Sequence, residues 1–523
     1  MEDLLRGYNL EELIPMFAGT MVTLLGQYIS IIIIFFIVLV VAATAFVKYT
    51  YGYWKRMKVP CFEPSFPFGN SDSLIPKGIA IGLISKKFYD QFKGTGQKLG
   101  GIFMGIQPYL VVVGPEQIKD VLIKDFQHFT DRGVYYTERE PLSVHLFSQP
   151  GAAWRNSRTK FTSVFTSAKM KAMFQTILNC SEGLKGAMEK CVEQKTDADV
   201  DMQEVAACYT TDSIGSCAFG IECNSFKHPD AEFRKMGRKL LTEFSLKDRL
   251  NLFLAIYAPS VSQKFGVRNI QREVSDFFVK TVNDIVSYRE KNELRRNDFL
   301  QLLIDVKNSD EKLSMNELVG QAFVFFAAGF ETSSTATTMT LFEVSRKQEL
   351  QEKLRREILE VLRKHDNKIT YDAIAEMKYL GQAVDETLRI WPPVQTLTRV
   401  CTKDYIFKNF DIKVEKGIPI MIPVTALHHD PEYWPDPDRW DPDRFSEENK
   451  QNRQLLTYLP FGDGPRNCIG LRFGLLQTKI ALITVLSNYR VTLSPQTVTP
   501  LGRDPETFVL TTKNRIYRRL ERV

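Results

Sequence analysis

A cysteine-bearing loop near the C-terminus carries the clearest chemical signal in the chain. Residues 461–470 read FGDGPRNCIG, and the helical pattern Leu471–Leu486 follows them. Three glycines and a proline predict a tight loop, which places the Cys468 thiol among backbone N–H donors at the positive end of that helix. Such surroundings favour the thiolate, the form in which cysteine binds a soft metal such as iron. A lone cysteine beside a glycine turn is usually a buried structural thiol, but the spacing Phe-x-x-Gly-x-Arg-x-Cys-x-Gly favours the ligand.

An acid and a hydroxyl interrupt an apolar helix further upstream. Residues 328–332 read AGFET inside a long predicted helix that starts with the capping-box pattern Ser314-x-x-Glu317. Thr332 can donate back to the carbonyl of Ala328 and bend the helix. The alternative is that Thr332 only bonds its own helix and that Glu331 faces solvent.

Two further pairs have helical spacing. Glu386 and Arg389 are three apart and share a helix face, and the segment Trp391-Pro392-Pro393 ends that helix. Alone, this pair is a solvated ion pair in most helices. Trp154 and Arg158 are four apart and also share a face, although such a pair can equally pack at a surface through a cation–π contact.

Taken together, these segments resemble a cytochrome P-450, a haem-thiolate monooxygenase, from the N-terminal apolar run to the C-terminus. Residues 54–60 (WKRMKVP) and 67–70 (PFGN) are similar to the start of insect microsomal enzymes that metabolise xenobiotics. The resemblance implies a mainly α fold with a small β portion, arranged as a triangular prism of helices around haem b. It implies insertion of one atom of O2 into a lipophilic substrate, and electrons from NADPH through an FAD- and FMN-containing reductase, with cytochrome b5 as a second candidate donor.

The resemblance also assigns roles to residues. Cys468 is the expected axial thiolate ligand of the haem iron, and Thr332 and Glu331 are the expected proton donors during O–O cleavage, beside space for dioxygen at Ala328 and Gly329. The expected haem contacts, including propionate ligands, are Phe461, Arg466, Arg399, Trp154, Arg158 and Arg132. Glu386, Arg389 and Arg444 (in the segment PDRF, 442–445) are expected to form a structural lock for the cysteine loop. Lys160, Lys169 and Lys171 are candidates for the reductase-docking face or, equally, for an ordinary solvated face.

The N-terminal region carries a long uncharged run. No Asp, Glu, Lys or Arg occurs from Leu13 to Val47, and Ile29–Val47 is almost wholly apolar, close to the roughly 20 residues that cross a bilayer. A secretory signal is less suitable because the run is too long and its preceding flank is acidic, and a core helix is rarely so uniform. The basic residues that follow, from Lys48 to Lys58, place the bulk of the chain on the cytosolic side. We expect a single-pass anchor in the endoplasmic reticulum membrane.

Composition sets the remaining limits. The chain has 523 residues, 44% hydrophobic and 25% charged, with a net charge of +6. These values exclude a wholly disordered chain, and a charge excess this thin gives no argument for a nucleic-acid partner. The eight cysteines contain no Cys-x-x-Cys pair, which disfavours a disulfide scaffold or a structural zinc site. Length alone suggests three or four domains, but Trp154, Glu331, Arg389 and Cys468 must all meet one haem, so one large domain is expected.

The expected organisation has four parts: a tail at 1–28 that lies in the lumen, an anchor at 29–47, a basic and proline-rich linker at 48–68, and the haem domain at 69–523. Met21 is an alternative start that would shorten the tail. Within the haem domain, helical periodicity covers Glu232–Phe244, Val274–Glu293, Leu318–Val344 and Leu350–Lys364, and β-like runs cover Leu110–Val113, Tyr405–Phe407 and Ile418–Ile422.

The substrate is not determined by the sequence. By position, the pocket draws on Tyr135, Tyr136, the Phe244–Tyr257 region, Phe325, Val394–Leu397 and Phe508, each of which could instead be ordinary core. Insecticides or plant toxins are the expected substrates by resemblance, and endogenous lipids or hormones remain open. Two other functions also stay open: a haem-thiolate isomerase or dehydratase, and a membrane-tethered protein that only binds its ligand.

Overall fold

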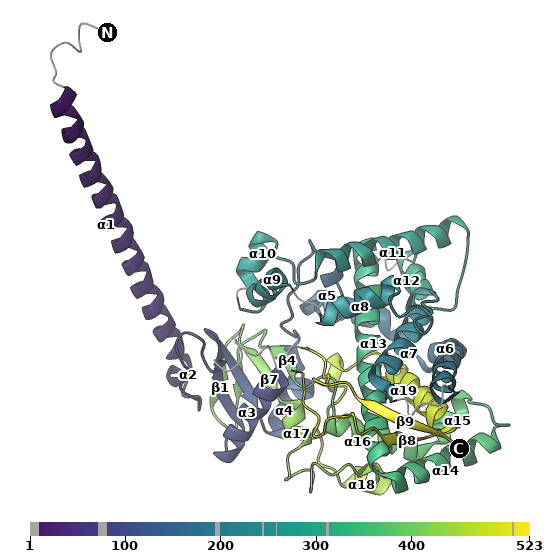
Figure 1. Ribbon diagram of the computed structural model, residues 1–523. Coiled ribbons are helices and arrows are strands. Elements are labelled where there is room, and N and C mark those ends of the chain that lie inside the picture. The colour runs from purple at the N-terminus through teal and green to yellow at the C-terminus, as the bar shows by residue number, and fades with distance from the viewer. Residues whose placement is uncertain are drawn as a thin grey trace.

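A long N-terminal helix stands apart from a body formed by the rest of the chain (Figure 1). The computed structural model describes residues 10–71, 81–193, 199–242, 245–257, 259–309, 313–504 and 507–523. The α-helices are α1 (Leu10–Tyr51), α2 (Tyr53–Arg56), α3 (Ile81–Gly94), α4 (Pro115–Lys119), α5 (Gly151–Thr162), α6 (Ser167–Glu193), α7 (Met202–Ile214), α8 (Glu232–Thr242), α9 (Leu246–Tyr257), α10 (Pro259–Phe265), α11 (Arg272–Lys291), α12 (Phe299–Lys307), α13 (Met315–Arg346), α14 (Gln348–Lys364), α15 (Tyr371–Glu376), α16 (Lys378–Ile390), α17 (Val424–His428), α18 (Glu447–Asn452) and α19 (Leu471–Leu486).

The strands form small sheets. They are β1 (Leu99–Met104), β2 (Gln107–Val112), β3 (Val200–Asp201), β4 (Leu397–Val400), β5 (Tyr405–Phe407), β6 (Ile412–Val414), β7 (Pro419–Ile422), β8 (Tyr489–Leu493) and β9 (Tyr517–Arg522). The largest sheet has the order β1-β2-β7-β4, and the others have the orders β3-β9-β8 and β5-β6. The prediction of a mainly α chain with a small β portion is confirmed.

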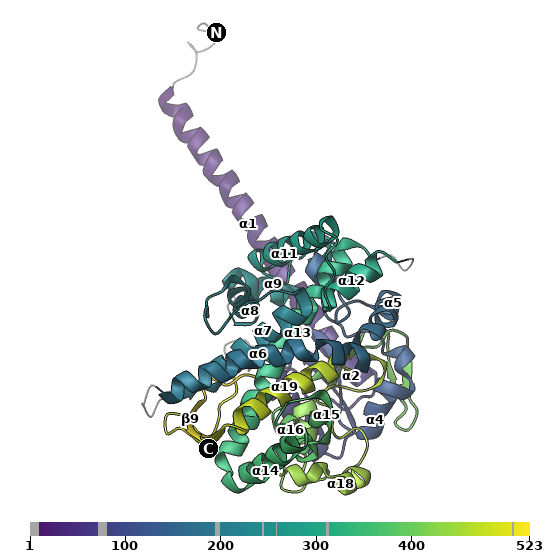
Figure 2. The ribbon, with the colours of Figure 1, turned by 90° about the vertical axis from the view of Figure 1, so that its right-hand side faces the viewer.

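The helices predicted from periodicity are present. α8, α11, α13 and α14 occupy the four predicted helical segments, and α19 begins and ends where its pattern does; Phe244 lies outside the described residues. α13 begins with the expected capping box, in which Ser314 and Glu317 bond each other's backbone. Its second half, Ser333–Ser345, is buried on all sides, whereas Ala328 is exposed. Other helices surround α13 (Figure 2).

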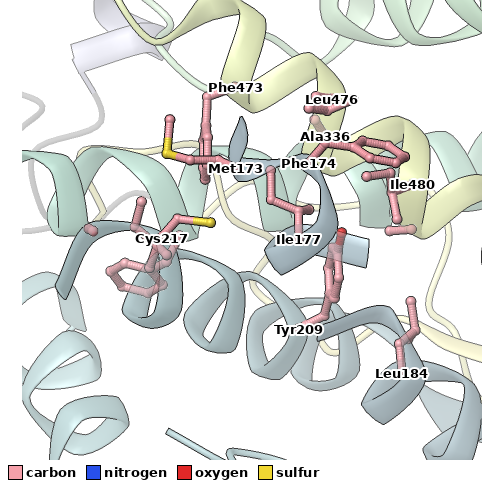
Figure 3. Close-up of a cluster of buried hydrophobic side chains, with 14 of the residues drawn as sticks. Met173, Phe174, Ile177, Leu184, Tyr209, Cys217, Ala336, Phe473, Leu476 and Ile480 are labelled. Carbon is pink, nitrogen blue, oxygen red and sulfur yellow. The ribbon is translucent and has the colours of Figure 1, made fainter. Parts of the chain in front are cut away.

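The main core lies where α6, α7, α13 and α19 meet (Figure 3). Ile177 from α6 and Ala336 from α13 pack there with Leu476 and Ile480 from α19. Tyr209 of α7 is fully buried, and its hydroxyl donates to the carbonyl of Gln477 at 3.2 Å. This core fixes α13, which carries Glu331 and Thr332, against α19, which directly follows the loop that carries Cys468.

The linker after α1 is docked on the β1-β2-β7-β4 sheet. Trp54 is fully buried, and its indole N–H donates to the carbonyl of Ile102 in β1 at 3.0 Å. A Cβ atom at Gly101 would lie 2.4 Å from Cγ of Trp54, so the sheet approaches this ring only because position 101 is glycine. The residues between anchor and body are therefore held by packing.

α1 is long and apolar enough to cross a membrane. Within its span Ala18–Tyr51, an 18-residue window has a mean hydropathy of 3.1 and is not buried by the rest of the protein. The span covers 34 residues, about 51 Å of helix, whereas a hydrocarbon core is about 30 Å thick. The helix therefore extends beyond the predicted anchor at 29–47 on both sides.

Candidate active site

The loop before α19 holds Cys468 through backbone contacts. The Cys468 amide donates to the carbonyl of Phe461 at 2.9 Å, which closes the loop on itself. Gly464 has a φ of +70°, and a Cβ atom there would lie 1.8 Å from the carbonyl oxygen of Leu122. Position 464 must therefore be glycine both for its left-handed conformation and for the close approach of a neighbouring segment. Gly470 then occupies the N-cap of α19.

Cys468 remains accessible, although neighbouring segments bond the loop that carries it. Burial raises its pKa, whereas a hydrogen bond from the Gly470 backbone and the charges of Arg132 and Arg158 lower that pKa. The helix N-terminus thus acts in the predicted direction but is outweighed by burial. A metal ion bound to the sulfur deprotonates a coordinating thiol directly.

Three of the predicted arginines lie in or contact this loop. Arg466 is buried and lies over the Trp154 ring at 4.2 Å, and its donors reach the backbone carbonyls of Thr130 and Gln149 at 2.7 Å. Arg132 donates to the carbonyl of Arg466 at 2.7 Å, and Arg158 donates to the carbonyl and side chain of Asn467 at 2.9 and 2.7 Å. These contacts tie the 130–149 segment and α5 to the cysteine loop.

Too few anions accompany these cations. Burial, with repulsion among the group, lowers the pKa of Arg466 to about 8, of Arg399 to about 9 and of Arg132 to about 10. Asp131, 3.9 Å from Arg466, offsets part of this repulsion by raising the pKa of Arg466. In the part of the chain that the structure describes, the buried Trp154 Nε1 and Arg399 Nε lack hydrogen-bond partners. The two propionates of a haem would supply the missing charge and acceptors, so the residues present fit this cofactor.

The predicted acid and hydroxyl lie on α13, close to α19. Thr332 donates to the carbonyl of Ala328 at 2.7 Å, as its position predicts. Its neighbour Ser333 lies 3.6 Å from where a Cβ atom at Gly474 of α19 would stand. Gly329 has a packing role too, because a Cβ atom there would be 2.6 Å from the side chain of Ile214 in α7.

Glu331 has electrostatic partners that sequence reasoning did not identify. Burial raises the pKa of Glu331, and the charge of Arg234 on α8 lowers it. Arg234 is buried and pairs with Glu204 of α7 at 2.9 Å. No local pattern joins residues 204, 234 and 331, so only the packing of α7 and α8 on α13 reveals the cluster.

The structure brings Glu386, Arg389 and Arg444 together. Arg389 donates to both Glu386 oxygens, at 2.7 and 2.8 Å, and both side chains are fully buried. Glu386 also accepts from the Asp441 backbone at 2.9 Å and lies 3.5 Å from Arg444.

His428 adds a support that the sequence did not suggest. Its Nδ1–H donates to the Arg389 carbonyl at 3.0 Å, and its Nε2 accepts the Leu459 amide at 2.7 Å. Leu459 comes two residues before Phe461. Burial lowers the pKa of His428 well below its usual value, so the neutral ring links the buried ion pair to the cysteine loop.

The proposed pocket residues have mixed positions. Phe325 packs against Phe165 and Phe299, at 4.9 and 3.6 Å between ring centroids, and belongs to the core. Tyr135 is buried and donates to the carbonyl of Val267, Tyr136 is half-buried, and Phe508 is 60% exposed. Within Val394–Leu397, Gln395 faces Arg503 at 3.1 Å. From the 244–257 region, Leu246, Leu250 and Phe253 are exposed on α9.

A mainly helical body with an accessible cysteine in a glycine loop, which several arginines contact, fits a haem-thiolate class of protein. A family model described as Cytochrome P450 matches residues 75–519. Among curated proteins, the chain is 42% identical to "Cytochrome P450 6A1" of Musca domestica over 492 residues, covering 92% of this chain and 96% of the relative. It is 40% identical to "Probable cytochrome P450 6a14" of Drosophila melanogaster over 490 residues, covering 90% and 96%. The chain belongs to the cytochrome P450 family, and haem binding and monooxygenase chemistry follow from that membership.

Proposed function

We propose that this protein is a microsomal haem-thiolate monooxygenase that oxidises lipophilic compounds with electrons from NADPH, delivered by a flavoprotein reductase. The observation that carries the proposal is the accessible Cys468 thiol in a loop bonded by arginines that have few anions among them. Haem b, when bound, would supply the activation of O2 and the insertion of one oxygen atom into substrate.

The protein's own residues have distinct tasks. Cys468 would provide the axial thiolate, while Arg132, Arg158, Arg399, Arg466 and Trp154 would hold the propionates. Phe461 closes the cysteine loop through its carbonyl. Glu331 and Thr332 would hold and move protons at the Glu331 carboxyl and the Thr332 hydroxyl, as general acid catalysis requires. Burial, which raises the Glu331 pKa, favours the protonated acid.

Basic and apolar side chains on the surface support the proposed partners. Lys169 and Lys171 are exposed at the start of α6, and half-buried Lys160 lies in the last turn of α5. These basic residues would receive an acidic reductase domain, and cytochrome b5 is a second candidate partner. α1 would anchor the chain in the endoplasmic reticulum membrane. Leu246, Leu250 and Phe253 give α9 an exposed apolar face on the side of the body nearer α1 (Figure 1), where lipid would cover it.

The substrates we favour are insecticides or plant toxins, with endogenous lipids or hormones as the second class.

A reduced carbon-monoxide difference spectrum of the purified protein tests the cofactor and its ligand. We expect the red-shifted thiolate band in the wild type and its loss in Cys468→Ser. NADPH- and reductase-dependent turnover of a lipophilic panel then tests the reaction. A thiolate band without such products would favour the isomerase or the binding protein, and the absence of the band would refute the whole proposal.

A further inference from the structure

A polar cleft of about 460 Å³ lies between α6, the end of α7, the loop 220–224 and the segment 296–298 before α12. A volume of this size is enough for a small organic ligand. None of the residues expected to hold haem or to move protons lines the cleft. The helices α6, α7 and α12 lie on the side of the body far from α1 (Figure 1), so the cleft is a separate space that a ligand dissolved in water can reach.

One wall of the cleft is fixed by a buried ion pair. Arg289 donates to both oxygens of Asp298, at 2.8 and 2.6 Å, and both side chains are 5% exposed. Arg289 also donates to the carbonyl of Phe219 at 3.0 Å. Gly220 has a φ of +68°, and a Cβ atom there would lie 2.6 Å from both side chains of the pair. These contacts hold the wall in one shape, which reduces the cost of ordering it when a ligand binds.

Two carboxylates in the cleft lack a paired cation. Asp212 of α7 is half-buried, and one of its oxygens accepts the Ser225 amide at 2.8 Å. Glu222 lies exposed on the loop that forms another side of the cleft. Among the residues that the structure describes, neither carboxylate makes an ion pair, whereas Asp298 is already neutralised by Arg289. Burial raises the pKa of Asp212, as expected for a carboxylate with too little compensating charge.

Neutral hydrogen-bonding groups make up much of the remaining lining. Arg296 also lines the cleft, and its guanidinium donates to the carbonyl of Gly220. Amide and hydroxyl groups can accept from and donate to the N–H and O–H groups of a ligand. Carboxylates beside such groups match a hydrophilic cation with several donors, which differs in kind from the lipophilic compounds proposed for the haem site. The side chains with these groups are Thr176, Asn179, Ser216, Asn224 and Asn297.

The helical segment that carries Asp212 also separates the cleft from α13. Asp212 and Ser216 are four apart and share one face. Ile214 lies between them on the opposite face, where its side chain would be 2.6 Å from a Cβ atom at Gly329 of α13. The cleft and the acid-bearing part of α13 are therefore on opposite sides of this segment.

We propose that the cleft is a second ligand site, which binds a small hydrophilic organic cation of the polyamine class through Asp212 and Glu222. One ammonium group would supply the charge that Asp212 lacks, and the other donors would bond the amides and hydroxyls of the lining. The ligand would bind at the same time as a lipophilic substrate, because the two sites share no residue. The inference does not depend on the proposed function.

The test uses spermidine as the probe, titrated calorimetrically into the haem-loaded protein. We expect one spermidine per chain, and affinity about tenfold weaker in Asp212→Asn, the size expected for losing one hydrogen bond to a charged group. Asparagine keeps an oxygen that can accept the Ser225 amide, so this variant should fold. Asp230→Asn is the matched control, because it breaks the exposed Arg238–Asp230 pair, 2.8 Å long, outside the cleft, and it should bind spermidine as the wild type does.

Alkylation of Cys180 locates the bound probe. This thiol lines the cleft and lies 3.8 Å from the Ser216 hydroxyl. Spermidine should slow its reaction with iodoacetamide, measured by peptide mass mapping, whereas magnesium chloride at the same ionic strength should not. Equal protection by magnesium would overturn the choice of an organic cation. Absence of binding, or equal affinity in wild type and Asp212→Asn, would overturn the site. Neither measurement reads the haem, so spermidine binding by a protein without the thiolate band would refute the proposed function alone.

Discussion

Removing the Glu386 carboxylate tests the buried network most directly. In Glu386→Ala, Arg389 loses both of its charge-assisted hydrogen bonds and keeps only the carbonyls of His428 and Arg439, at 2.8 and 3.2 Å. The Asp441 amide also loses its acceptor. Because Arg389 is fully buried, its charge is left largely uncompensated.

The magnitude follows from that burial. Breaking a buried ion pair by removing one partner costs about 3–5 kcal/mol, a large share of the roughly 5–15 kcal/mol that stabilises a typical folded protein. We therefore expect Glu386→Ala to lower the midpoint of thermal unfolding strongly. We also expect it to lose most of the carbon-monoxide thiolate band, since Arg389 connects through its own carbonyl to His428 and so to the cysteine loop.

The control is Asp443→Asn, on the same short helical turn as Arg444. It breaks the exposed Lys353–Asp443 pair, 3.0 Å long, which is worth at most about 1 kcal/mol. The double variant Glu386→Leu with Arg389→Met replaces the whole pair by apolar side chains and should recover part of the lost stability. The reasoning fails if Glu386→Ala unfolds at the temperature of Asp443→Asn with its thiolate band intact.

Four further predictions concern single positions. Burial lowers the His428 pKa, so the folded protein keeps this ring neutral. The free energy of unfolding is therefore unaffected by His428 above about pH 6.5, and below that pH it falls by about 1.4 kcal/mol per pH unit. Between pH 7 and pH 5.5 the thermal midpoint should fall more in the wild type than in His428→Asn. Gly464→Ala should abolish the thiolate band and lower the thermal midpoint, since the new Cβ atom cannot occupy the same place as a backbone oxygen. Thr332→Ala should continue to oxidise NADPH while forming less product per NADPH, and equal coupling to wild type would remove Thr332 from proton transfer. Arg234→Met should move the part of the pH–rate profile that depends on Glu331 to higher pH, because the Arg234 charge lowers the Glu331 pKa; Glu331→Gln should lack that dependence, and an unmoved profile would contradict the pairing.

Much of the architecture could be predicted because the signals are local. A period of 3.6 residues marks α13 and α14, and a capping box marks the start of α13. The bond from Thr332 to Ala328 and the pairing of Glu386 with Arg389 follow from helical spacing alone. Such contacts depend on the geometry of one helix and not on how the chain folds.

The contacts that could not be predicted from the sequence join segments that are far apart in the chain. His428 contacts Arg389 and Leu459 from a separate helix, and Glu140 meets Ser275 across 135 positions. Neither partner carries a spacing signal that would select it from the other polar residues. Phe325 shows the opposite case: its place on α13 suggested the pocket, yet Phe165 and Phe299 enclose it in the core, because which face of a helix meets which neighbour is decided by tertiary packing.

The arginine cluster links cofactor binding to folding. Each lowered pKa among Arg132, Arg399 and Arg466 means that the fold holds a charged guanidinium at a cost in free energy. Arg466 and Arg132 offset part of that cost by donating to backbone carbonyls, and those same bonds fasten the 130–149 segment to the cysteine loop. An anionic cofactor placed among these groups would relieve the remaining repulsion. Cofactor binding would therefore stabilise the folded conformation of the loop that carries Cys468. The residues that recognise the cofactor are therefore also the residues that make the loop depend on it.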